Sequence, residues 1–310
     1  MKRIFVIAAL IILILPAFCK EYKIINTKTN KEIELKEMAE RLGDYDVIFF
    51  GEFHENRILH SLEFELLEMF HRNNKNMIIS MEMFERDVQP ILDKYLNNEI
   101  LEEDFLANSR PWPNYETDYK PLIEFAKENE LTVVAANIPR RYANMISKQG
   151  MSALDSLSVE EKKYVAKKHI VFEDEYKERF IKAMKEEMVH SSKMPKGMKM
   201  NLDLIYAAQC IKDDTMAESI LKYHRIPPRR KVIHFNGDFH SSKHLGTAQK
   251  IQVLEPMLKV AVITPKGCEN EFTWEDEDLL EGEFLILYKE EVSEETSEEK
   301  IEEDGSKEEE

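Results

Sequence analysis

Two phrases of the 310-residue sequence have the residue types of a catalytic or metal-binding site. The first, VIFFGEFHENRILH, covers 47–60, and the second, VIHFNGDFHSSKHLG, covers 232–246. In each, an apolar run is followed by glycine, a carboxylate, phenylalanine and histidine. Carboxylates and imidazoles together are what divalent metal binding and general acid–base chemistry require. The candidate residues are Glu52, His54, Asp238 and His240.

Polar residues also end two further apolar runs. NMIISMEMF (76–84) ends near Glu82, and LTVVAAN (131–137) ends at Asn137. In an open parallel sheet, ligands bind outside the carboxyl ends of the strands, so we expect all these side chains on one rim. His60 lies six residues after the first motif histidine, and that helical spacing predicts that it faces elsewhere.

Apolar runs alternate with amphipathic segments along the chain. This is typical of an α/β fold with a parallel-stranded central sheet flanked by helices. Short, wholly apolar runs such as DVIFF indicate strands that are covered on both faces. A short strand or hairpin and a small helix are expected within 21–43. The other predicted strands are 46–50, 76–84, 131–137, 232–236, 258–264 and 284–288, and the other predicted helices are 54–72, 88–96, 119–128 and 139–150.

Residues 152–223 interrupt this alternation of strands and helices, because no strand pattern occurs in them. Helical spacing predicts helices over 159–169, 173–189 and 202–223, which we interpret as a helical insertion or cap over the sheet. The join HSSKMPKGMKMN before the last of these is rich in methionine. Its methionines indicate either core packing or an adaptable apolar surface for a flat ligand or a partner.

The two ends of the chain differ from its middle. Residues 1–19 have a basic start, an apolar stretch, a proline and small residues, which is typical of a secretory signal peptide. Cys19 is either part of the cleavage site or a lipidated first residue, so we expect export to the periplasm or anchoring in the bacterial cell envelope. Residues 289–310 hold more than half of the net charge of −17 and are predicted to be an acidic disordered tail. The segment 20–288 is predicted to be one domain, and the negative charge argues against nucleic acid binding.

Five longer segments occur in a characteristic order over about 46–264. They are GEFHENRILH, SMEMFERDVQPILDKYL, WPNYETDYKPLIEFAKENELTVVAANIPRRY, AAQCIKDDTMAESI and FNGDFHSSKHLG. Together they resemble the ChaN-like haem-binding proteins, iron-regulated bacterial lipoproteins of the wider Tiki and erythromycin-esterase superfamily. The resemblance implies haem binding, in at least one member as a cofacial pair across a homodimer with tyrosine ligation of iron. The wider superfamily includes metal-dependent hydrolases, whose motif falls here on Glu52, His54, Glu82 and His240.

The resemblance leaves the iron ligand of this chain to be placed. Tyrosinate is a hard anionic oxygen that suits ferric iron, and Tyr206, just before AAQC, is the first candidate unless it is an ordinary helix aromatic. His190, in the methionine-rich join, is the second candidate. Arg140 and Arg141 open a helix after the third strand and could pair with haem propionates. Alternatively, Arg140 only braces the rim carboxylates.

Two functions follow from these two arguments. The resemblance favours an exported haem-binding protein in haem and iron acquisition, which forms a homodimer on haem binding and works with an outer-membrane haem uptake system. The residues alone favour a metal-dependent hydrolase, in which Glu52, His54 and His240 hold a divalent metal and a carboxylate serves as base. We expect the first function, and the second is the alternative.

Overall fold

Eight strands form the centre of the computed structural model, which describes residues 20–190 and 201–290. Their order in the sheet is β2-β1-β8-β7-β3-β6-β4-β5, and the five pairs from β8 to β5 are parallel, whereas β1 is antiparallel to both β2 and β8. The predicted α/β fold with a parallel-stranded centre is thus confirmed, with an antiparallel edge. The strands are β1 (Tyr22–Asn26), β2 (Lys31–Ile33), β3 (Val47–Glu52), β4 (Ile78–Glu85), β5 (Thr132–Asn137), β6 (Val232–Gly237), β7 (Val260–Cys268) and β8 (Phe284–Lys289).

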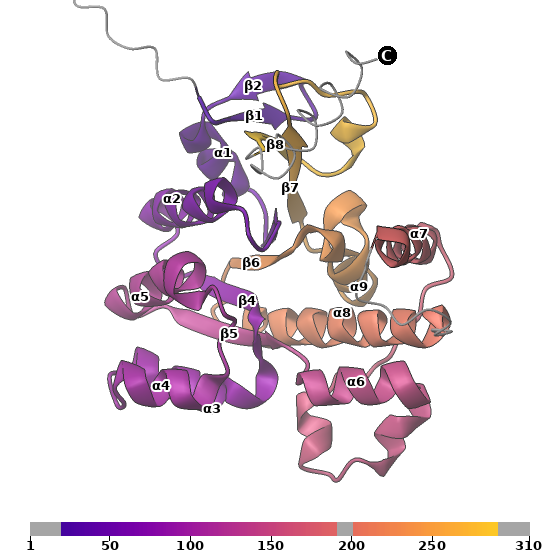
Figure 1. The fold of residues 1–310 in the computed structure, drawn as a ribbon. Coiled ribbons are helices and arrows are strands. Elements are labelled where there is room, and N and C mark those ends of the chain that lie inside the picture. Colours follow the sequence, from indigo (N-terminus) through magenta and orange to yellow (C-terminus); the bar gives the residue numbers. More distant parts are fainter. Residues whose placement is uncertain (1–19, 191–200, 291–310) are drawn as a thin grey trace, which may run out of the picture.

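Helices cover both faces of this sheet (Figure 1). Strand β3 shows why, since Ile48 and Phe50 pack into the apolar cluster on one face while Val47 and Phe49 pack into the cluster on the other. This alternation, with all four side chains buried, is what a central parallel strand requires. The first face is covered by α1 (Leu35–Leu42), α2 (Arg57–Asn73), α3 (Gln89–Leu96), α4 (Glu102–Ser109) and α5 (Lys120–Glu128), and the second by α8 (Leu202–His224) and α9 (Gly246–Leu254).

The region 152–223 contributes one of the helices that pack directly on the sheet. Met216 and Ile220, in the C-terminal half of α8, lie in the same buried cluster as Val47 of β3. The N-terminal half of α8 instead packs against α6 (Arg140–Gln149) and α7 (Glu175–His190). A single long helix therefore connects the sheet with the helices beside it, and its middle lies near the ends of the strands (Figure 1).

The helix predicted over 159–169 is wrong. Only a short 3-10 helix, Glu161–Tyr164, forms there, and the following residues run in bends and irregular backbone. Side chains of α8 hold this backbone, because Thr215, Glu218 and Asp214 accept the N–H groups of residues 166, 167 and 170. Bonds from α8 replace those that a helix would make within itself, so tertiary contacts outweigh the local helical spacing.

The ends of the chain lie largely outside the described residues, including the predicted signal peptide at 1–19 with Cys19. The tail boundary predicted at 289 needs correction, because Lys289 is the last residue of β8 and pairs with β7. Within 20–190 and 201–290, no helix is long and apolar enough to cross a membrane.

Candidate functional site

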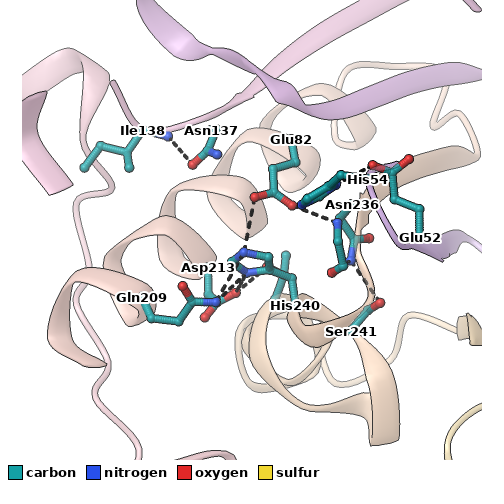
Figure 2. Close-up of polar contacts among 12 residues, drawn as sticks. Glu52, His54, Glu82, Asn137, Ile138, Gln209, Asp213, Asn236, His240 and Ser241 are labelled. Carbon is teal, nitrogen blue, oxygen red and sulfur yellow. Dashed lines mark hydrogen bonds and ion pairs between the residues drawn. The ribbon is translucent and has the colours of Figure 1, made fainter. Parts of the chain in front are cut away.

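Three neighbouring strands end at one rim, as the sequence predicts. Glu52 ends β3, Glu82 lies near the end of β4, and the turn that holds His240 follows β6. Figure 2 shows these side chains pointing toward one another, with Gln209 and Asp213 approaching from α8. The carboxyl ends of adjacent parallel strands are where α/β sheets place their ligands.

His54 is the exposed member of this rim. Its imidazole is 43% exposed, and its Nδ1 lies 2.6 Å from Oε1 of the buried Glu52. The same oxygen accepts the hydroxyl of Tyr119 at 2.7 Å. Burial lowers the pKa of His54, but the hydrogen bond to Glu52 and the charge of Glu82 outweigh it and leave the pKa raised. The carboxylate therefore fixes the ring through Nδ1, and Nε2, the other nitrogen, has no hydrogen bond among the described residues.

Gly237 leaves the space that this ring occupies. A Cβ at this position would lie 2.8 Å from Cε1 of His54, closer than side chains approach one another. We expect Gly237→Ala to push the half-exposed ring away from Glu52 without unfolding the protein, because the ring is free to move outward. The pKa of His54 should then fall toward its ordinary value. An NMR titration of the histidine Hε1 signals measures this, with His54→Gln to assign the resonance, and an unchanged pKa would contradict the geometry.

His240 is the buried member of the rim and has a carboxylate on each nitrogen. Nε2 lies 3.2 Å from Oε1 of Glu82, and Nδ1 lies 2.6 Å from Oδ1 of Asp213. Burial lowers the pKa of His240, but the charges of Glu82 and Asp213 outweigh it and raise the pKa to about 10. The pKa of Glu82 is likewise held well below its usual range, because the charge of His240 outweighs its burial. At neutral pH His240 and Glu82 therefore form a buried ion pair of an imidazolium and a carboxylate.

The predicted metal set of Glu52, His54 and His240 does not fit this geometry. Both nitrogens of His240 face carboxylates, so it offers no free lone pair to a metal. Among the described residues, the three side chains with ligand spacing are instead Glu52, His60 and Glu63. The prediction that His60 faces elsewhere is therefore wrong, because its Nδ1 lies 3.4 Å from Oε2 of Glu52.

Two other rim residues lie outside this network of histidines and carboxylates. Asp238 lies against Gly51, where an added Cβ would meet its Oδ1 at 2.5 Å, and burial raises its pKa to about 7. Asn137 accepts the N–H of Ile138 at the turn that leads into α6 (Figure 2). Neither residue has a hydrogen bond to the rim histidines.

The residues predicted to bind haem lie apart from one another. Tyr206 is fully buried, its hydroxyl donates to the carbonyl oxygen of Phe172 at 2.8 Å, and burial raises its pKa far above the ordinary value. In this arrangement its oxygen is not presented to a ligand as tyrosinate. His190 is the last residue of α7, and its side chain lies outside the described part of the chain. Arg140 is exposed at the start of α6, and its backbone N–H donates to Oε1 of Glu85.

A groove of about 540 Å³ lies beside the rim. Trp112 connects the two, because its ring meets the His54 ring edge-on with centroids 4.8 Å apart. Ion pairs with Glu85 and Asp87 neutralise two of the three arginines in the groove. Its walls are Met83, Glu85, Arg110, Pro111, Trp112, Pro113, Arg140, Arg141 and Asn144. Apolar walls with arginines at the edge suit a flat apolar ligand that carries carboxylates.

Comparison with known protein families gives a match that includes nearly all of these residues. The family described as haem-binding uptake, Tiki superfamily, ChaN, matches residues 38–251. The chain belongs to the ChaN family. This match covers more than half of the sequence and contains the rim, the groove and α8, so the site described above lies within the family region of this ChaN-like chain.

A solved structure of a ChaN protein has the same fold. ChaN of Campylobacter jejuni, whose structure describes cofacial haem binding to that protein, is 22% identical, with a TM-score of 0.67 over 88% of this chain and 98% of its own. The erythromycin esterase EreC, in its open conformation, is 12% identical, with a TM-score of 0.45 over 90% of this chain and 86% of its own. Among the curated proteins, none matches the sequence.

Proposed function

We propose that this protein binds haem as cargo and takes part in bacterial haem and iron uptake. The observation that carries the proposal is the family match over residues 38–251, which includes the whole rim and the groove beside it. The groove adds a chemical reason, since Trp112 and Pro113 offer apolar contacts for a porphyrin and Arg140 offers a cation for a propionate.

The cellular setting is part of the same proposal. We propose that residues 1–19 direct export and that the mature chain acts in the periplasm or is anchored by a lipid on Cys19. Loading with haem would form a homodimer, and an outer-membrane haem uptake system would supply the haem. The basic and apolar composition of the first nineteen residues supports export.

Arg140 is proposed to pair with a haem propionate. Its guanidinium is exposed at the groove, so Arg140→Ala removes a cation without breaking the core. We expect hemin affinity to fall about tenfold, since a hydrogen bond to a charged group contributes about 1.5 kcal/mol. Arg72→Ala, at the far end of α2 and exposed, is the matched control and should leave the affinity unchanged. Equal weakening in both variants would indicate attraction by net charge alone.

We propose His54 as the iron ligand. Its imidazole is partly exposed and lies beside the groove, and its Nδ1 is held by Glu52 in the way common for ligating histidines. His54→Ala should shift the Soret band of the hemin complex, whereas Tyr206→Phe and His190→Ala should preserve it. A changed spectrum in Tyr206→Phe with an unchanged one in His54→Ala would return the role to the tyrosine.

A metal-dependent hydrolase is the second candidate function. The observation that favours it is the pairing of each rim histidine with a buried carboxylate, Glu52 for His54 and Glu82 for His240. In that function, His54 is the exposed base. Hydrolysis of 4-nitrophenyl esters, measured with and without added Mn²⁺, tests it. Activity that is lost in His54→Ala would support the hydrolase, and rates equal to buffer would dismiss it for this substrate class.

A further inference from the structure

A buried cluster of two carboxylates and one imidazole lies between β3 and α2. Glu52 comes from the end of β3, and His60 and Glu63 lie one turn apart on α2. One ligand atom from each of the three lies within 4.8 Å of the others. All three residues are buried, with exposed fractions of 1% for Glu52, 5% for His60 and 0% for Glu63. The cluster is separate from the groove and lies behind the exposed His54.

The charges of this cluster are not balanced by basic side chains. Among the described residues, the ion pairs of Glu52 and Glu63 are all with histidines. Oε2 of Glu52 and Oε1 of Glu63 are buried and accept no hydrogen bond there. Two adjacent buried carboxylates are costly unless a proton or a cation lies between them.

The imidazole of His60 is oriented as a metal ligand. Its Nε2 lies 3.1 Å from the carbonyl oxygen of His54, which accepts a hydrogen bond only from an Nε2–H group. Nδ1, the other ring nitrogen, faces Glu63 at 3.0 Å and Glu52 at 3.4 Å. In the neutral ring, the proton on Nε2 leaves Nδ1 with the free lone pair. A backbone carbonyl is a usual hydrogen-bond partner for the second nitrogen of a ligating histidine.

We propose that Glu52, His60 and Glu63 bind one first-row divalent cation such as Zn²⁺ or Mn²⁺. One imidazole nitrogen and two carboxylates suit such ions, and the cation neutralises the two buried charges. It also joins the end of β3 to α2. Because Oε1 of Glu52 holds both His54 and Tyr119, the bound cation fixes the carboxylate that orients the exposed histidine. Asp118, whose side chain is 12% exposed and lies 3.5 Å from Nε2 of His60, is the neighbouring carboxylate toward solvent.

Metal titration of the chelator-treated full chain tests the proposal. We expect one Zn²⁺ or Mn²⁺ per chain by calorimetry, a rise in Tm of several degrees, and X-ray absorption of the zinc form showing only N and O ligands. Glu63→Gln, which keeps the shape of the side chain, should bind at least tenfold more weakly. His60→Gln is a second variant with the same expectation, should the first fail to fold by circular dichroism.

Two controls distinguish this site from one that uses the rim histidines His54 and His240. Glu65→Gln, exposed on the same helix, should bind metal as the unmodified chain does. His54→Ala should also keep the metal, since His54 is not one of the three ligands. Metal that is lost in His54→Ala but kept in Glu63→Gln would place the ion at the rim and overturn the proposal. Absence of stoichiometric binding in the unmodified chain would overturn it as well and leave a shared proton between the two carboxylates.

Discussion

Asp213→Ala should lower the free energy of unfolding by about 3–5 kcal/mol, the range found when one partner of a buried ion pair is removed. The side chain is fully buried and accepts three hydrogen bonds. They come from His240 at 2.6 Å, from Thr247 at 2.8 Å and from the hydroxyl of Tyr176 at 2.8 Å. Its removal leaves a buried positive imidazole facing a cavity and two hydroxyl groups without their acceptor.

Urea unfolding, followed by circular dichroism at pH 7, measures this loss. Asp203→Ala is the control on the same helix, because that carboxylate is exposed and its pair with Lys177 should contribute less than about 1 kcal/mol. Asp213→Asn should fall between the two, since it keeps the shape but loses the charge. A loss below about 1 kcal/mol in Asp213→Ala would show that the Glu82–His240–Asp213 chain is not formed in solution.

Stability should fall by a few kcal/mol as the pH rises from about 6.5 to about 10, since each unit of pKa shift corresponds to about 1.4 kcal/mol. The pKa of His240 is raised from 6.5 to about 10 by Glu82 and Asp213, against the effect of burial. A group whose pKa is raised on folding contributes its full stabilisation below pH 6.5, the pKa of the unfolded state. That contribution is lost as the pH rises through the pKa of the folded state. The pKa of Glu82 is lowered below 4.5, so its contribution is present above pH 4.5 and is lost in acid.

The pair therefore stabilises the fold most between about pH 4.5 and 6.5. Unfolding free energies measured at pH 6, 8 and 9.5 give the alkaline slope. His240→Gln should flatten this slope, because the group that releases its proton is gone. An equal slope in the variant would assign the alkaline loss to other groups and contradict the charged state of His240.

Much of the fold could be predicted from the sequence because its signals are local. The apolar runs of β3 and β6 and the helical spacing of α2 and α8 agree with their packing, so local pattern and tertiary structure select the same elements. The segment 159–169 could not be predicted, because side chains some fifty residues later hold its backbone. Hydrogen bonds between residues far apart in the sequence do not change the spacing of apolar residues in either segment.

The site could be predicted only as far as the strand ends. Glu52, Glu82 and His240 follow apolar runs, and a parallel sheet brings such ends together. Asp213 lies in a long helix and does not follow an apolar run in the sequence. Its contact with His240 depends on how α8 crosses the rim. The i, i+3 spacing of His60 and Glu63 was the signal that could have placed them on one helix face with Glu52. The sequence cannot show whether the hydroxyl of Tyr206 is accessible. In the structure it is buried and donates a hydrogen bond to the carbonyl oxygen of Phe172.

Hemin titration of the purified mature chain is the most direct test of haem binding at this groove. Absorbance follows the complex, and size-exclusion chromatography of the same samples follows the oligomeric state. We expect a saturable Soret change at a fixed haem-to-chain ratio and a shift from monomer to dimer on loading. The affinity for hemin should be lower in Arg140→Ala than in Arg72→Ala. A change that never saturates, or that is identical in both arginine variants, would contradict haem binding at this groove.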